Sequence, residues 1–235
     1  MSIIDVVNII LGLFLFDIMY SDVKEIHGWV IEQIFVFWGT IRFIDSIVMF
    51  TSYFGVCGIP EKIRSGDLDI FLLKPINTRF IISIEKLDIP SLLNSVISVI
   101  IIIINLNAAI IAFSFPKIIM YLLFIIIYSY LYYCLVCIPR FLSFWFIRID
   151  SFIKLESSLI QFTYKAPGII YNGITKIIFF YALPFGIIGT IPTQYITSTL
   201  RLNDYILTII TTFSFHCIST ILWKKGIARY NSANS

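Results

Sequence analysis

Long stretches without a charged residue divide the chain. They cover residues 89–116, 118–139, 177–200 and 205–223. A helix rises about 1.5 Å per residue, so about 20 apolar residues cross the ~30 Å hydrocarbon core of a bilayer. Each stretch therefore predicts a membrane-spanning helix.

Two weaker apolar stretches precede these four. The first lacks the basic start and the small-residue cleavage site of a signal peptide, so we expect a retained helix. The second carries Glu32 near its start and Arg42 and Asp45 in its interior. The six predicted spans are approximately 3–20, 29–56, 88–112, 117–139, 174–191 and 205–223.

Composition agrees with this pattern. Of 235 residues, 59% are apolar and 13% are charged, against about 25% charged in a typical soluble domain. So few charges cannot form the polar shell of a soluble fold, and a net charge of +3 is too small for a nucleic-acid surface. We therefore expect an all-α, polytopic transmembrane bundle forming one domain over 1–235, in contact with the lipid bilayer and with no nucleic acid.

The basic residues predict an orientation. With the N-terminus inside, 13 of the 17 Lys and Arg residues fall on the cytoplasmic side, 3 on the outer side, and Arg42 lies within a span. The cytoplasmic count includes Lys165 and Lys176. Because cytoplasmic loops carry the excess of Lys and Arg, both termini are predicted to be cytoplasmic.

The cytoplasmic loop between spans two and three, residues 57–87, is the most informative segment. Residues 59–65 predict two helical turns, with Pro60 at the first position and Glu61 near the positive end of the helix dipole. Gly66 can adopt the left-handed conformation that ends a helix. Two carboxylates and a bulky apolar cluster follow over 67–73, so the segment can lie on the membrane surface or dock into a groove on a partner.

The residues from Ile63 to Asn77 read I-R-S-G-D-L-D-I-F-L-L-K-P-I-N. This pattern resembles the cytoplasmic loop of ABC-2-type permeases, specifically the small six-span exporter permeases. Further matches follow in the order of that family: Phe144-Trp145, Pro184-Phe185 with Ile191-Pro192, and W-K-K-G-I-A-R-Y-N-S over 223–232.

The resemblance implies the permease subunit of an ATP-driven exporter in a bacterial cytoplasmic membrane. Two permease subunits, identical or different, would form the pathway, and cytosolic ABC ATPase subunits would bind beneath it. The chain contains no G-x-x-x-x-G-K-[ST] motif, so we expect no cofactor in it, with ATP and Mg²⁺ held by the partner.

In this interpretation the loop couples ATPase motion to the spans. Asp67 and Asp69 would meet basic groups on the ATPase, while the cluster Ile70-Phe71-Leu72 would fill an apolar groove. The alternative is a loop that only lies on the lipid, with solvated acids. The predicted coupling residues are Glu61, Arg64, Gly66, Asp67, Asp69, Phe71, Leu73, Lys74 and Pro75.

Within the membrane, Arg42 and Asp45 lie three residues apart on one helix face. A lone charge at the bilayer centre costs about 2.5–3.5 kcal/mol, so we expect an ion pair. It would line the pathway, lock a subunit interface, or serve packing only.

Small residues and prolines interrupt the fifth apolar region. A broken helix at membrane depth is tolerated where it is buried in protein or lines a cavity. The predicted outer gate turn, which could instead be a simple helix end, consists of Pro184, Gly186, Gly189 and Pro192. Residues 140–165, with aromatic and basic side chains, predict an interfacial helix or a solvated loop.

Two other functional classes compete with the permease. One is an integral-membrane enzyme acting on lipid-linked substrates, and the other is a membrane scaffold without a transport cycle. The enzyme would need clustered catalytic side chains, whereas the only two histidines, His27 and His216, are far apart in sequence and no H-E-x-x-H or G-x-S-x-G motif occurs. We therefore expect a transporter subunit that is not itself an enzyme.

Overall fold

The computed structural model describes residues 27–108 and 114–233, with five isolated positions before them. Those positions are Leu11, Gly12, Phe14, Ile18 and Glu25. Over the described residues the regular structure is helical and contains no strand, which confirms the all-α prediction. The predicted first span, 3–20, lies outside the described residues apart from four of the isolated positions.

Three helical segments of the described chain are long and apolar enough to cross a membrane, or four if one bent helix pair is counted as a span. The first segment runs from Ile31 to Ser65: α2 (Ile31–Val48) continues through a π-helical turn (Met49–Tyr53) and α3 (Phe54–Cys57) into α4 (Ile59–Ser65). The others belong to α8 (Phe115–Phe141) and α12 (Leu202–Ala233). These three match predicted spans, and α7 (Ser91–Ala108) is a shorter apolar helix at the place of another.

The remaining elements are short. Between α4 and α7 in the chain come α5 (Leu68–Leu72) and α6 (Thr78–Ile84). After α8 come a 3-10 turn (Leu142–Phe144), α9 (Asp150–Lys165), a second 3-10 turn (Gly168–Ile170), α10 (Gly173–Ile177) with a π-helical turn (Ile178–Ala182), and α11 (Ile187–Ile196).

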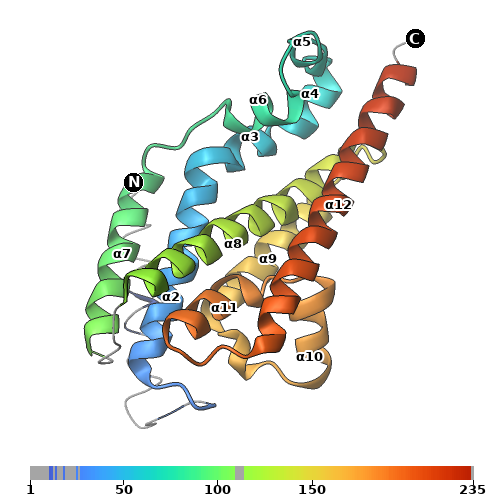
Figure 1. Cartoon of the computed structure of the whole chain (residues 1–235). Coiled ribbons are helices and arrows are strands. Elements are labelled where there is room, and N and C mark those ends of the chain that lie inside the picture. Colours follow the sequence, from blue (N-terminus) through green and yellow to red (C-terminus); the bar gives the residue numbers. More distant parts are fainter. Residues whose placement is uncertain are drawn as a thin grey trace.

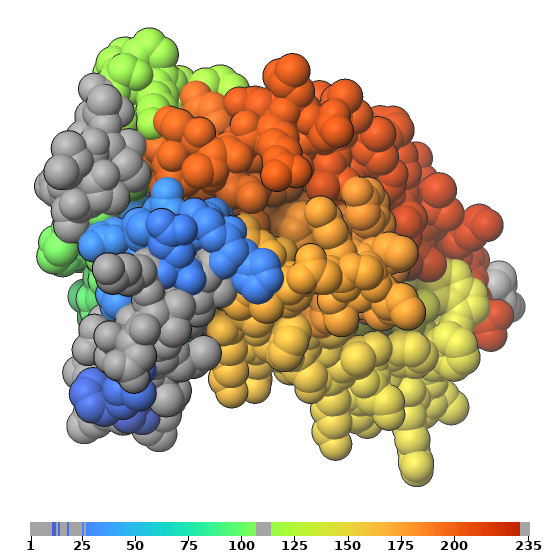
Figure 2. Space-filling view, turned by 90° about the horizontal axis from the view of Figure 1, so that it is seen from below, coloured from blue at the N-terminus to red at the C-terminus, as the bar shows by residue number. Residues whose placement is uncertain are grey.

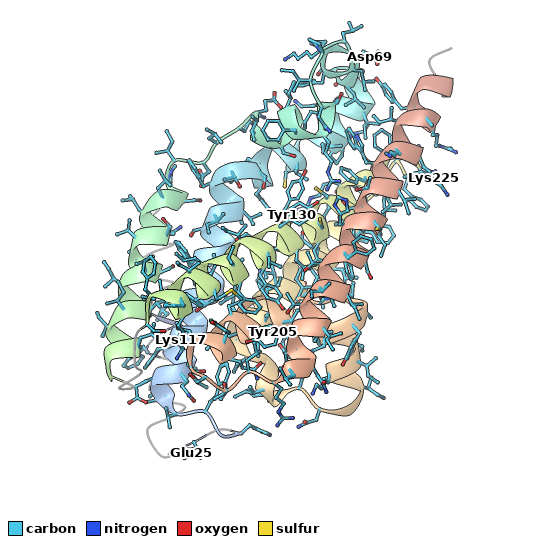
Figure 3. The ribbon with its side chains drawn as sticks, viewed as in Figure 1. Glu25, Asp69, Lys117, Tyr130, Tyr205 and Lys225 are labelled. Atoms are coloured by element: carbon cyan, nitrogen blue, oxygen red, sulfur yellow. The ribbon has the colours of Figure 1, made fainter. Side chains whose placement is uncertain are left out.

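The molecule has two distinct ends (Figure 1). We call the end that carries α4, α5, α6 and the last turns of α12 the loop end, and the other, where α10 lies, the opposite end. Figure 2 views the opposite end, where α10, α11 and the start of α2 come together. Asp69 and Lys225 lie towards the loop end, whereas Glu25, Lys117 and Tyr205 lie towards the opposite end (Figure 3).

Helix α2 is at the centre of the packing and contacts α7, α8 and α11. Its side chains Phe37, Trp38, Ile41 and Ile44 are almost fully buried. Lipid can cover apolar side chains as well as protein does, so this burial reflects close helix packing in place of the water exclusion that drives soluble folding.

The predicted span over 174–191 falls on two short helical pieces bent by 93° between Ala182 and Ile187, so the helix is interrupted in the region where its prolines and small residues predict it. Pro184 in the connection has no backbone N–H, and the N–H of Gly186 donates to the Phe179 carbonyl at 2.9 Å, which closes the turn. Residues 184–193 are all buried. Protein therefore surrounds the interrupted backbone, as membrane depth requires.

Helix α9 corrects the interfacial-helix prediction for 140–165. Glu156, Ile160 and Thr163 form a buried face, and the helix packs on α8 and α2. The Arg140 Nη1 atom lies 2.6 Å from Glu156 Oε2, and both side chains are buried. This ion pair allows a helix of mixed polarity to enter the bundle, because each charge is neutralised by the other.

The position of α9 also changes the basic-residue count. Lys165 at its end lines a cleft beside α2, and α10, which carries Lys176, lies at the opposite end (Figure 1). Neither residue therefore belongs with the loop-end cations. Lys62, Arg64, Lys74, Arg79 and Lys86 remain in or beside the loop-end helices, so the orientation stays a prediction based on them.

Replacement of Glu156 by Ala is expected to lower the free energy of unfolding by about 3–5 kcal/mol, because it leaves the Arg140 charge buried without its partner. Chemical unfolding in mixed micelles measures this. The matched control is Glu61→Ala, which removes an exposed pair with Arg64 (2.7 Å) and should cost below about 1 kcal/mol. Equal losses in the two variants would contradict the structural role of the Arg140–Glu156 pair.

Candidate functional site

The loop between α3 and α7 folds as its sequence predicts at its start. Helix α4 covers residues 59–65 with Pro60 in the first turn, and Gly66 ends it at φ 84°. A side chain at that φ would be strained, so glycine fits this position. The Ser65 hydroxyl then donates to the Asp67 carboxylate at 2.7 Å and stabilises the turn into α5.

Helix α5 separates the apolar cluster into a buried and an exposed part. Phe71 is buried, and the Nζ atoms of Lys62 and Lys74 lie 4.7 and 4.8 Å from its ring centroid. Phe71 is thus held by its own chain and is not free to fill a groove on a partner. Asp67 and Lys74 are exposed as well as most of the side chains around them. Five of the exposed side chains form what we call the docking patch: Asp69, Ile70, Leu73, Pro75 and Ile76.

The most exposed apolar member of the docking patch is Leu73, at 86%. Ile70 and Ile76 are each 58% exposed. An apolar patch with an acidic neighbour at the tip of a short helix is typical of a protein interaction site. Glu61 and Arg64 pair with each other in α4, so their charges are matched within the loop.

Arg79 connects the loop to the spans. It is not among the coupling residues predicted from the sequence. It lies in α6, whose start is capped by Asn77 accepting from the Phe80 N–H at 3.2 Å. Its Nε donates to the Tyr133 hydroxyl of α8 at 3.0 Å, and its Nη2 donates to the Ser219 hydroxyl of α12 at 2.7 Å. The one signal in the sequence is a basic residue directly before an apolar run.

The end of α12 is fixed against the same loop. Gly226 packs on the Phe144 ring so closely that a Cβ atom there would lie 2.2 Å from the ring. Trp223 and Tyr230 also contact Phe144, with centroid distances of 5.8 and 6.4 Å. The Tyr230 hydroxyl donates to the Gly66 carbonyl at 3.4 Å. Three motif segments that are far apart in sequence thus meet at the loop end.

Arg42 and Asp45 do not form the expected ion pair within 4 Å. The Arg42 guanidinium instead lies 4.4 Å from the Tyr164 ring centroid and 5.2 Å from that of Trp38. Asp45 faces the hydroxyls of Tyr132 and Tyr164. Both charged residues line a cleft of about 900 Å³.

The four residues of the predicted gate turn are all buried. Pro184 and Gly186 lie in the connection before α11, while Gly189 and Pro192 lie within α11. Gly189 packs closely on Phe37 of α2. The structure therefore brings Gly189 against α2, far in sequence, whereas Gly186 packs on Tyr171 and Phe179.

The fold defines a helical membrane protein with a group of short helices at one end. Residues 6–234 match the model of the ABC-2 family transporter protein family (ABC2_membrane_6), and the chain belongs to that family. This confirms the resemblance and makes the chain a membrane component of a transporter. No curated protein and no solved structure matches the chain.

Substitution of Gly226 by Val is expected to separate α12 from Phe144 and to release the loop, because the new methyl groups occupy the space of the ring. Hydrogen exchange of residues 59–75, followed by mass spectrometry, should become faster. Ala228→Val is the control, since Ala228 is exposed on the same helix. Unchanged exchange in the Gly226 variant would show that the contact does not fix the loop.

Proposed function

We propose that this chain is the permease subunit of an ATP-driven exporter in a bacterial cytoplasmic membrane, with the loop end facing the cytosol. A second permease subunit, identical or different, completes the pathway. The ATPase is a separate cytosolic subunit that holds ATP and Mg²⁺. Membership of the ABC-2 transporter family supports the permease role, and the cations retained at the loop end support the orientation.

The observation that carries the proposal is the connection from docking patch to spans. The patch lies on and directly after α5, and α6 follows it after a few residues. Arg79 of α6 is hydrogen-bonded to α8 and α12 at once. A movement of the patch is therefore transmitted to two long helices by direct contacts, as a coupling element requires.

The docking patch is the surface we assign to the ATPase. Asp69 offers a carboxylate to basic groups, and Leu73, Ile70 and Ile76 offer apolar area for a groove. Phe71 serves as the internal support of the patch, between two lysine side chains. The rival arrangement, a loop lying on lipid, would leave Asp69 at the headgroup level without a protein partner.

Leu73→Arg is expected to abolish co-purification of the ATPase, because it places a charge in the centre of the apolar contact. The tagged chain is purified from its source cells, and bound proteins are accepted as the ATPase only if they carry a P-loop and hydrolyse ATP. Ile147→Arg is the matched control, since Ile147 is 85% exposed but lies outside the patch. Full ATPase binding by the Leu73 variant would refute the patch assignment.

Arg79→Lys is expected to keep the ATPase bound but to lower its vanadate-sensitive ATP turnover about tenfold. The reason is that one ammonium group cannot replace a guanidinium that donates hydrogen bonds to α8 and α12 at once. Turnover is measured in the reconstituted complex. Arg64→Lys serves as the control, since Arg64 is exposed and its ion pair is with Glu61 of its own helix. Normal turnover with Lys at position 79 would show that coupling does not pass through α6.

A further inference from the structure

A cleft lined by both charged and apolar side chains lies among helices α2, α7 and α9. It has a volume of about 900 Å³. Helix α2 contributes Trp38, Arg42 and Asp45, α7 contributes Asn94, and α9 contributes Tyr164. The cleft is outside the loop-end site, and neither the docking patch nor the Arg79 connection uses it.

The charged groups of the cleft are balanced. Arg42 and Lys165 supply two positive charges, and Asp45 and Asp88 supply two negative charges. Glu156 also reaches the cleft, but its carboxylate is neutralised by Arg140 at 2.6 Å. A lining of this kind favours a ligand that carries both signs over a purely anionic or purely cationic one.

Several polar atoms of the lining are buried without a hydrogen-bond partner. They are Arg42 Nε, Asp45 Oδ1 and Asn94 Oδ1. A buried unsatisfied polar group is costly, and the cost is higher for a charged one. The orphaned set contains one donor and two acceptors, so a ligand that accepts a hydrogen bond at Arg42 and donates at Asp45 and Asn94 would satisfy all three atoms.

The cleft reaches from the start of α7 into the bundle. The Asp88 N–H donates to the Phe50 carbonyl at 3.2 Å, which fixes Asp88 at the level of the π-helical turn. Phe50 is eight residues beyond Arg42, or about 12 Å along a helix. Apolar side chains accompany the charges along this length: Leu11, Met49, Phe54 and Ile160.

We propose that this cleft binds the zwitterionic headgroup of a phospholipid. The phosphate is held by Arg42 and Lys165, and the ammonium group is held by Asp45 and the Asn94 carbonyl oxygen. The apolar lining accepts the first part of an acyl chain. A free zwitterion of the same chemistry is the competing source, and a lipid is favoured because the cleft combines charges with apolar side chains inside a membrane protein.

That the bound phospholipid is also the transported substrate rests on the proposed exporter function. The binding of the phospholipid in the cleft does not depend on that function. Native mass spectrometry of the purified chain in detergent therefore tests it without the ATPase. Phosphatidylethanolamine is expected to be retained about tenfold more than phosphatidylglycerol, and more than phosphatidylethanolamine with an acetylated amine, an equilibrium difference of one decade. These lipid comparisons use the unaltered chain, so they do not depend on whether a variant folds.

Asp45→Asn is expected to lower the preference for phosphatidylethanolamine over phosphatidylglycerol about tenfold, and Arg42→Gln to lower retention of both lipids. The control is Arg148→Gln, which alters an exposed cation outside the cleft and should leave retention unchanged. Soluble glycerophosphoethanolamine, added in excess, should not displace the lipid.

Equal retention of the three lipids by the unaltered chain would overturn the proposal. A preference that persists in Asp45→Asn would overturn the assignment to this cleft, and displacement by glycerophosphoethanolamine would overturn the lipid as the source. If retention is selective but the reconstituted complex hydrolyses no ATP, the proposed function fails while the binding site stands.

Discussion

The buried ion pair between Arg140 and Glu156 is the interaction on which the rest of the bundle depends. The interior of a membrane offers no water to solvate a charge, so a helix with the polarity of α9 can enter only if its charge meets a partner. Arg140 supplies that partner and also donates to the Val136 carbonyl at 2.9 Å. Once α9 is held there, its other side chains form one wall of the cleft.

The loop end is stabilised differently, because its helices are short and need contacts with longer helices. Helices α4, α5 and α6 have too few turns to be stable alone. Phe144, Arg79 and Tyr230 provide the contacts that hold them against α8 and α12.

The sequence predicted the elements whose signals are local. The charge-free stretches located α8 and α12, and Pro60 with Gly66 delimited α4 correctly. Side-chain partners were not predictable, because they come from distant segments. Phe71 packs under Lys62, and α9 is held in the bundle by the ion pair between Glu156 and Arg140. A search for charge-free stretches cannot recognise either contact. The six-span count and the cytoplasmic termini remain predictions.

The π-helical turn at Met49–Tyr53 has a consequence for how this chain could change over evolution. Such a turn amounts to one extra residue within an α-helix. Loss of a single residue there would restore the regular helix and leave the residues on either side close to their present faces, because the wide turn already absorbs the extra residue. Tyr53, whose ring lies 5.5 Å from the Arg140 guanidinium, would stay on the side of that contact. The same deletion in a regular part of the helix would rotate everything that follows by about 100°, so this stretch is where the helix tolerates a change of length best.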